Sequence, residues 1–406
     1  MSTASDNPDA ATQRAILLLS LATFASMVAQ RICDAMLPEL SRVFSVSLAQ
    51  AAQVVSLFAV VYGLSQLLYG PLGDRLGKFR VLTWGTLTGC IGSLLAVFSQ
   101  SLDMLVAARM LVALSAAAII PMSLAWIGDN VDYEHRQATL ARVGVGTTLG
   151  ITGGQMAGGL LTDTLGWRWA FVFMTLLFAG VGALLYADLR RQQARPVVDE
   201  FTQPVVRPGF VAQALMIITG RWSRVILAVA FIEGAVGFGV LAIWASHLHH
   251  ELNLSLTTSG ATVALFGMGG MLYMALASRL IPHLGERGLA VLGALLLMVS
   301  SALLAYTSQW LLALPASLLG GFGFFMFHNT MQANATQMAP AARGTAVSLF
   351  AAFLFMGQSV GVLLAAALVE WLGSAQVIVL GAGVMLMLGL LLSVALKRRD
   401  DLMHLE

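Results

Sequence analysis

Residues 377–396 read VIVLGAGVMLMLGLLLSVAL, a run of twenty residues without a charged side chain. A bilayer core about 30 Å thick is crossed by about 20 residues of α-helix, so this run has the length of a membrane span. Residues 81–98 form a similar run, and both are apolar on every face, whereas a barrel strand alternates apolar and polar side chains. The stretch therefore predicts a transmembrane helix and an α-helical membrane protein.

Outward from this run, the chain contains twelve apolar stretches of similar length, separated mostly by short loops. Of its 406 residues, 58% are hydrophobic and 10% are charged, and the mean hydropathy is +0.83. Soluble domains have roughly 45–50% apolar and about 25% charged residues, so this composition excludes an aqueous fold. We place the spans at residues 15–43, 50–72, 79–98, 103–126, 137–162, 167–188, 223–247, 256–281, 287–307, 310–334, 343–371 and 374–396.

The basic residues predict the orientation of the chain. With both termini in the cytoplasm, 18 of the 22 Lys and Arg residues fall on cytoplasmic segments, as the positive-inside rule requires. The net charge of +2 therefore reflects sidedness and gives no indication of nucleic-acid binding. We expect a multi-pass protein with both ends on the cytoplasmic side.

A polar stretch at residues 190–222 divides the spans into two groups of six. We therefore expect a tail at 1–14, a six-helix half at 15–189, a cytoplasmic linker at 190–222, a second half at 223–397 and a tail at 398–406. Sliding the sequence over itself by 207 residues supports a duplication. The pairs that coincide are Arg136 with Arg343, Gly150 with Gly357, Gly154 with Gly361, Asp163 with Glu370 and Gly166 with Gly373. Parallel repeats of this kind place a transport site between the halves, near the membrane midplane.

The loop after span two reads GPLGDRLGK over residues 70–78. It resembles the signature loop of the major facilitator superfamily, and residues 15–397 resemble that family's bacterial twelve-span drug/proton antiporters. The resemblance implies twelve transmembrane helices in two pseudo-symmetric six-helix halves, an inner-membrane location, and function as a monomer without cofactors. It also implies that the loop latches the halves together on the cytoplasmic side, through Gly70, Gly73, Asp74, Arg75, Gly77 and Lys78. Glycines permit the tight turn, and Asp74 can face the positive N-terminus of the helix that begins near Arg343.

Two further motifs resemble those of the same family. Arg109 matches its membrane-embedded arginine in span four, although Val112 and Ala113 stand where Gln and Gly are usual. In span five, GITGGQMAGG at 150–159 resembles the motif that marks exporters, with Gln155 in place of the usual Pro. Small residues also let helices approach closely in lipid, so packing is the alternative role of Gly150, Gly154, Gly158 and Gly159. We expect Gln155 to face either the cavity or a neighbouring helix.

Ionisable side chains inside spans are costly and tend to mark functional sites. The spans hold Arg31, Asp34, Arg109 and Glu233. Asp34 lies in a run, ICDAMLP, that resembles the first-span motif of drug/proton antiporters, and it shares a helix face with Arg31. Asp34 and Glu233 are rival proton carriers. The alternatives are a static Arg31–Asp34 pair, and pairing of Glu233 with Arg109 or Arg31. Arg109 stays cationic, so we expect it to tune a carboxylate without itself carrying the proton.

Polar and aromatic residues of the spans are candidates for the cavity wall. The polar candidates, which bind substrate or hold helices together, are Gln30, His328, Asn329, Gln332 and Gln358. The aromatic candidates, on spans that line the cavity in related folds, are Tyr62, Trp126, Trp244, Phe266 and Phe325. His247, His249 and His250 suggest metal by composition, but we expect them to be solvated loop histidines.

The chain shows no P-loop, dinucleotide turn, paired-cysteine metal motif or nucleophile elbow, so we expect neither an enzyme nor a metal site. The sequence favours a proton-coupled secondary active transporter that exports small lipophilic or cationic compounds by alternating access. Its partners would be a small-molecule substrate, protons and the bilayer. Two alternatives remain: a proton symporter importing a polar metabolite through a narrow site at Arg31, Arg109 and Asn329, and a ligand sensor with a transporter fold.

Overall fold

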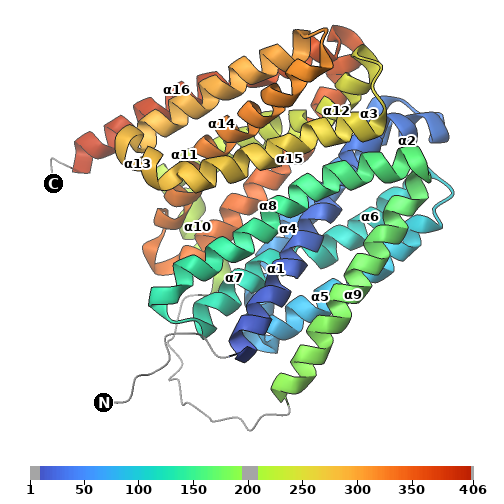
Figure 1. The fold of residues 1–406 in the computed structure, drawn as a ribbon. Coiled ribbons are helices and arrows are strands. Elements are labelled where there is room, and N and C mark those ends of the chain that lie inside the picture. Colours follow the sequence, from blue (N-terminus) through green and yellow to red (C-terminus); the bar gives the residue numbers. More distant parts are fainter. Residues whose placement is uncertain (1–9, 194–208, 404–406) are drawn as a thin grey trace, which may run out of the picture.

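The computed structural model describes residues 10–193 and 209–403, which form a bundle of long helices (Figure 1). Residues 1–9, 194–208 and 404–406 lie outside the described part, and with them the middle of the predicted linker and pieces of both predicted tails. Within the described ranges the regular structure is helical and contains no strand, so the predicted all-α fold is confirmed.

The first half holds the helices α1 (Ala10–Arg31), η1 (Asp34–Met36), α2 (Leu37–Phe44), α3 (Leu48–Ala51), α4 (Gln53–Leu76), α5 (Lys78–Val97), α6 (Leu102–Ala116), α7 (Ile119–Asn130), α8 (Tyr133–Thr164) and α9 (Trp167–Gln193). The second half holds α10 (Phe210–Thr219), α11 (Arg221–Glu233), η2 (Gly234–Gly239), α12 (Val240–Glu251), α13 (Leu256–Tyr306), α14 (Trp310–Gln337), η3 (Pro340–Ala342), α15 (Arg343–Leu372) and α16 (Ser374–Met403). The short elements η1 and η3 are 3₁₀-helices, and η2 is a π-helix.

Ten helical units of the described chain are long and apolar enough to cross a membrane. One of them, the 51-residue α13, contains non-helical backbone at Gly285 (φ 60°), which divides it into two spans. The 32-residue α8 supplies a further span between α7 and α9. Counted in this way the described helices are consistent with the twelve predicted spans.

Prolines interrupt two spans of the first half. Because proline has no N–H, it cannot donate to the carbonyl four residues earlier, and its ring crowds that carbonyl. Pro38 therefore leaves the carbonyl of Asp34 outside the α-helical pattern, and the chain forms the 3₁₀ turn η1 at this point. Pro121 acts in the same way on Ala117, where α6 ends before α7 begins.

Glycines allow α8 to lie directly against α1. A Cβ atom added to Gly150 would be 2.5 Å from the carbonyl oxygen of Phe24, and one added to Gly154 would be 2.9 Å from that of Val28. Gly158 meets the backbone of Ile32 in the same way. The expected packing role of this motif therefore has a direct geometric basis, since any side chain would force the helices apart.

The two ends of the bundle differ in how closely the halves approach. We call the end with the α4–α5 turn and the start of α15 the Lys78 end, and the end with the α8–α9 turn and the start of α13 the Asp163 end. Toward the Asp163 end the halves are joined: the Ser56 and Ser359 hydroxyls lie 2.8 Å apart, and Asp163 accepts a hydrogen bond from the backbone N–H of Thr257. Gly159 also abuts the backbone of Leu256.

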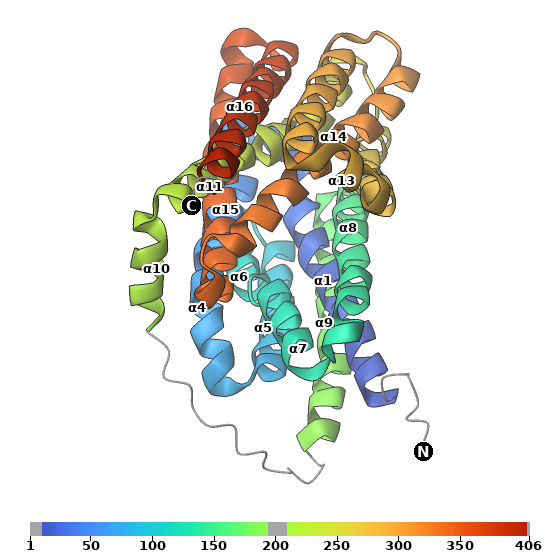
Figure 2. The same cartoon turned by 90° about the vertical axis from the view of Figure 1, so that its left-hand side faces the viewer.

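The predicted polar linker proves to be partly apolar. Its last part forms α10, which stands beside α4 and α15 in Figure 2. Ile217 packs in a cluster with Leu227 and Leu349, while Val211 and Leu215 are exposed on the outside of the bundle. The polar interpretation failed here because the short run FVAQALMIIT follows a proline-rich stretch and is too short to be recognised as a span.

Candidate functional site

A cavity of about 340 Å³ lies between the two halves. Its walls come from α1, α4, α7 and α8 of the first half and from η2, α13, α14 and α15 of the second. On α8, α14 and α15 the lining residues lie toward the Lys78 end, and Ser348 also lines a second pocket at that end. The cavity is therefore directed to the Lys78 end, whereas the Asp163 end is packed shut.

The cavity wall is mainly apolar. Five predicted substrate-binding residues line it, namely Gln30, Phe325, His328, Asn329 and Gln332. Among the described lining residues, His328 is the one ionisable side chain, and none is acidic. A wall of this kind suits a lipophilic molecule that makes a few directed hydrogen bonds.

Four of the predicted aromatic residues do not line this cavity. Tyr62 is fully buried, and its hydroxyl lies 3.1 Å from that of Ser26. Trp126 packs on Phe79 near the Lys78 end. In the second half, Trp244 and Phe266 pack edge to face, with ring centroids 5.8 Å apart and both side chains buried. These side chains serve helix packing, because their positions on the helix turn them away from the cavity.

Two predicted amides also lie behind the wall. Gln155 takes the helix-facing alternative: it is 1% exposed and its Nε2 donates to Oδ2 of Asp34 at 2.9 Å. Gln358 is fully buried, and its Oε1 accepts from Nε2 of Gln30 at 3.5 Å, which links α15 to α1. Gln155 thus belongs to the Asp34 site, although the sequence did not indicate this contact.

Asp34 forms the first buried ionisable group. Arg31 donates to Oδ2 of Asp34 at 3.2 Å, and both side chains are 0% exposed. The Arg31 guanidinium also stacks on Phe238, 4.4 Å from the ring centroid, so it is stabilised by a cation–π contact with the second half. Oδ1 of Asp34 has no hydrogen-bond partner among the described residues. The predicted pair therefore exists, but it satisfies only one carboxylate oxygen.

Glu233 forms the second group, and its partner differs from the predicted ones. Its Oε1 lies 2.6 Å from Nδ1 of His328, so the contact is with a histidine of α14 and not with Arg109 or Arg31. Oε2 of the same carboxylate has no hydrogen-bond partner in the described part of the chain. Sequence reasoning missed this pair because the two residues are 95 positions apart and nothing local relates them.

Aromatic rings surround His328. Its ring centroid lies 5.5 Å from that of Phe324, with the two planes nearly parallel, and 6.0 to 6.1 Å from those of Phe238, Phe325 and Phe350. Such faces stabilise an imidazolium through their quadrupoles and stack with a neutral imidazole. The histidine is thus held firmly whether or not it carries a charge.

Arg109 is bound to the backbone of its own half. It donates to the carbonyl oxygens of Ala29 at 2.7 Å and Val54 at 3.4 Å, and it stacks 4.1 Å from the centroid of Phe58. These contacts tie α6 to α1 and α4. These contacts give Arg109 a structural role in holding the three helices together, in addition to any electrostatic effect on Asp34.

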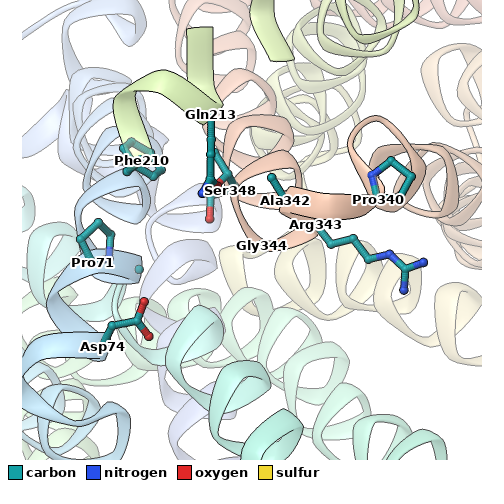
Figure 3. Close-up of a pocket in the computed structure, with 11 residues that line it drawn as sticks. Pro71, Asp74, Phe210, Gln213, Pro340, Ala342, Arg343, Gly344 and Ser348 are labelled. Atoms are coloured by element: carbon teal, nitrogen blue, oxygen red, sulfur yellow. The ribbon is translucent and has the colours of Figure 1, made fainter. Parts of the chain in front are cut away.

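The predicted latch residues lie at the end of α4, in the α4–α5 turn and at the start of α5. Gly77 adopts φ 91°, the left-handed conformation that a tight turn requires of glycine. Asp74 and the start of α15 lie on opposite sides of a pocket of about 520 Å³, and Arg343 points away from Asp74 (Figure 3). Asp74 instead lies 3.9 Å from Lys78, which also pairs with Asp129. The latch is open.

The histidines of span seven lie in a helix and not in the expected loop, and of the three only His250 is exposed. All three lie in α12, and His247 is 2% exposed, with Nδ1 2.8 Å from the hydroxyl of Ser374. Nδ1 of His249 lies 2.6 Å from the carbonyl oxygen of Leu254. In the searched, described part of the chain no group of three potential ligands could hold a metal ion.

Comparison with known proteins identifies the family. The profile of the Major Facilitator Superfamily matches residues 19–351 and 226–404, so the chain belongs to this superfamily of transporters. The chain is 23% identical over 255 residues to the uncharacterized MFS-type transporter YwfA of Bacillus subtilis (strain 168), a match that covers 62% of this chain and 60% of YwfA. It is 27% identical over 179 residues to the multidrug export protein EmrB of Escherichia coli (strain K12), over 44% of this chain and 35% of EmrB.

The fold is also similar to solved transporters. The crystal structure of a bacterial homologue of the human lysosomal transporter Spinster, in an inward-facing and unoccupied conformation, superposes with a TM-score of 0.72. The match covers 96% of each chain at 15% sequence identity. The chain is therefore a multi-pass membrane protein with a transporter fold.

Proposed function

We propose that the chain is a proton-coupled secondary transporter that exports small lipophilic molecules by alternating access. The Lys78 end would face the cytoplasm, as the positive-inside rule suggests, so the structure would correspond to the cytoplasm-open state. EmrB, to which the chain is 27% identical over 179 residues, is named a multidrug export protein, and this similarity supports export as the direction of transport.

One observation carries the proposal. Asp34 and Glu233 are both 0% exposed, they lie in opposite halves, and each keeps one oxygen without a partner among the described residues. A buried carboxylate with incomplete pairing is costly in a medium of low dielectric constant, and uptake of a proton relieves that cost. Both groups lie close enough to the cavity for its occupant to affect them. His328, which contacts Glu233, lines the wall, and so does Phe238, which stacks on the Arg31 partner of Asp34.

The apolar wall favours lipophilic over cationic substrates, because none of the described lining residues is acidic. It also weighs against the polar-metabolite symporter. That alternative needs Arg31 and Arg109 in a polar binding site, but they are 0% and 1% exposed, and of the three expected residues only Asn329 lines the cavity.

An imposed proton gradient provides enough energy for export. One charge crossing 100 mV supplies about 2.3 kcal/mol, which corresponds to roughly a fiftyfold concentration ratio of substrate. The test uses proteoliposomes with an internal pH dye and a lipophilic test compound, for the unmodified protein and for Asp34→Asn, Glu233→Gln and an exposed control, Asp103→Asn.

We expect protons to move in the direction opposite to the compound. This movement should be abolished by one of the substitutions at the two buried carboxylates and should be unchanged in the control. Proton movement in the same direction as the compound would refute export by antiport. Binding without movement of either species would favour the ligand sensor.

A further inference from the structure

His328 connects a buried carboxylate to the cavity. Its Nδ1 lies 2.6 Å from Oε1 of Glu233, and the side chain lines the cavity while remaining 7% exposed. The two nitrogens of an imidazole lie on different edges of the ring. With Nδ1 directed at Glu233, the remaining edge, which carries Nε2, is the one available to a molecule in the cavity.

We call the Glu233–His328 pair the dyad. The number of protons that it carries determines whether Nε2 of His328 is a hydrogen-bond donor or acceptor. In the proton-free dyad, the Glu233 carboxylate accepts from Nδ1–H, so Nε2 carries a lone pair and is a hydrogen-bond acceptor. One added proton gives either an imidazolium beside a carboxylate or a carboxylic acid that donates to Nδ1. Nε2 carries a hydrogen in both cases, so the loaded dyad presents a donor wherever the proton resides.

Few other charged groups face the dyad. Arg31 of the Arg31–Asp34 pair stacks on Phe238, whose ring centroid lies 6.0 Å from that of His328, and Tyr273 of α13 contacts the neighbouring Asn329. In the described chain, the ionisable residues of α15 and α16 lie at the ends of those helices, and α11 carries Arg221 and Arg224 at its start. The contact between Glu233 and His328 is therefore the main interaction between ionisable groups at this site.

We propose that the hydrogen-bonding polarity of a substrate sets its coupling to the proton. A small, uncharged aromatic molecule with a hydroxyl or N–H donor binds the proton-free dyad, and proton loading then displaces it, which is antiport. A molecule of the same shape with only an acceptor binds the loaded dyad and travels with its proton. The exported class is therefore aromatic hydrogen-bond donors such as phenols, which the rings of Phe238, Phe325 and Phe350 accommodate.

This inference rests on the proposed proton-coupled transport, but its test uses binding alone. The probes are 2-naphthol and its methyl ether, 2-methoxynaphthalene, which share one aromatic body and differ in the donor. The full chain in lipid nanodiscs is titrated calorimetrically at roughly pH 6 to 8, where histidine titrates, in buffers of different ionisation enthalpy. The buffer dependence of the heat gives the number of protons exchanged.

The expected result is release of up to one proton when naphthol binds and uptake of up to one when the ether binds. The two dissociation constants then change with pH in opposite directions, by up to about tenfold per unit. His328→Gln is expected to abolish both exchanges, and the exposed His283→Gln serves as the matched control. Three results with the unmodified protein would each overturn the inference: proton exchange of the same sign for both probes, no proton exchange, or no binding of either probe.

Transport of the same probes in proteoliposomes tests the proposed function separately from the assignment of the dyad. Opposite proton exchange on binding, without transport of naphthol against a gradient, would refute the proposed function and leave the assignment of the dyad intact. Proton-coupled transport with the same sign for both probes would refute the dyad assignment and leave the proposed function intact.

Discussion

Replacing Asp163 with asparagine is expected to weaken the closure of the Asp163 end. The Asp163 carboxylate accepts a hydrogen bond from the backbone N–H of Thr257, in the first turn of α13. The N-terminus of a helix carries about half a positive charge, which favours a nearby anion. Asparagine keeps an acceptor oxygen but loses the charge, so the variant isolates the electrostatic part of the contact.

The magnitude follows from the exposure of this contact. Asp163 is exposed, which places the charge–dipole effect in the range of about 0.3–1 kcal/mol and excludes larger values typical of buried sites. The equilibrium between the present state and one opened at the Asp163 end should therefore shift roughly two- to fivefold toward opening. Because the charge is screened by ions, the shift should shrink between about 0.1 M and 1 M salt, where the Debye length falls from about 10 Å to about 3 Å.

The assay is a distance distribution between spin labels at Leu165→Cys and Ser308→Cys, exposed positions of the two halves at the Asp163 end. Glu370→Gln is the matched control, because Glu370 is the repeat counterpart of Asp163, is exposed, and loses the same charge. An equal shift in both variants, or one independent of salt, would show that the Asp163 contact does not hold this end closed.

Three further outcomes are expected. Gly154→Val should lower the free energy of unfolding by about 1–3 kcal/mol in chemical denaturation, because a side chain there collides with α1, whereas Gly180→Ala, with nothing within 4 Å, should be neutral. Arg109→Lys should lower it by roughly 1–3 kcal/mol in the same assay, because an ammonium cannot reproduce both backbone bonds and the ring stacking, and an unchanged midpoint would contradict that role. A disulfide between Asp74→Cys and Thr345→Cys should form at least several times faster in a state closed at the Lys78 end, measured by gel shift, since the present pocket separates them.

The sequence was informative wherever a property is local. Hydropathy predicted the spans, and Arg31 and Asp34 form a pair because they are three residues apart, at the end of α1 and the start of η1. The glycines at 150–159 predicted close packing, since the lack of a side chain acts directly at the contact.

Contacts between spans could not be predicted in the same way. A helix that is apolar on every face carries no periodic signal of which face is inside, so the orientations of Trp126, Trp244 and Phe266 were not fixed. The partner of Glu233 depends on how α11 and α14 meet, 95 residues apart. Gln155 was left open between two roles for this reason, and only the packing of α8 on α1 brings it to Asp34.

The π-helix η2 begins directly after Glu233 and contains three glycines packed on neighbouring helices. A π-turn holds about one residue more than an α-turn, so the span stores a surplus residue next to its carboxylate. If that surplus were moved toward the start of α11, the residues that it passes, Glu233 among them, would rotate by about 100°, the angle of one residue in an α-helix, without a hinge or any unfolding. Such a rotation would carry Glu233 away from His328, and so the breaking of the dyad could be achieved by a change of helical register within a single span.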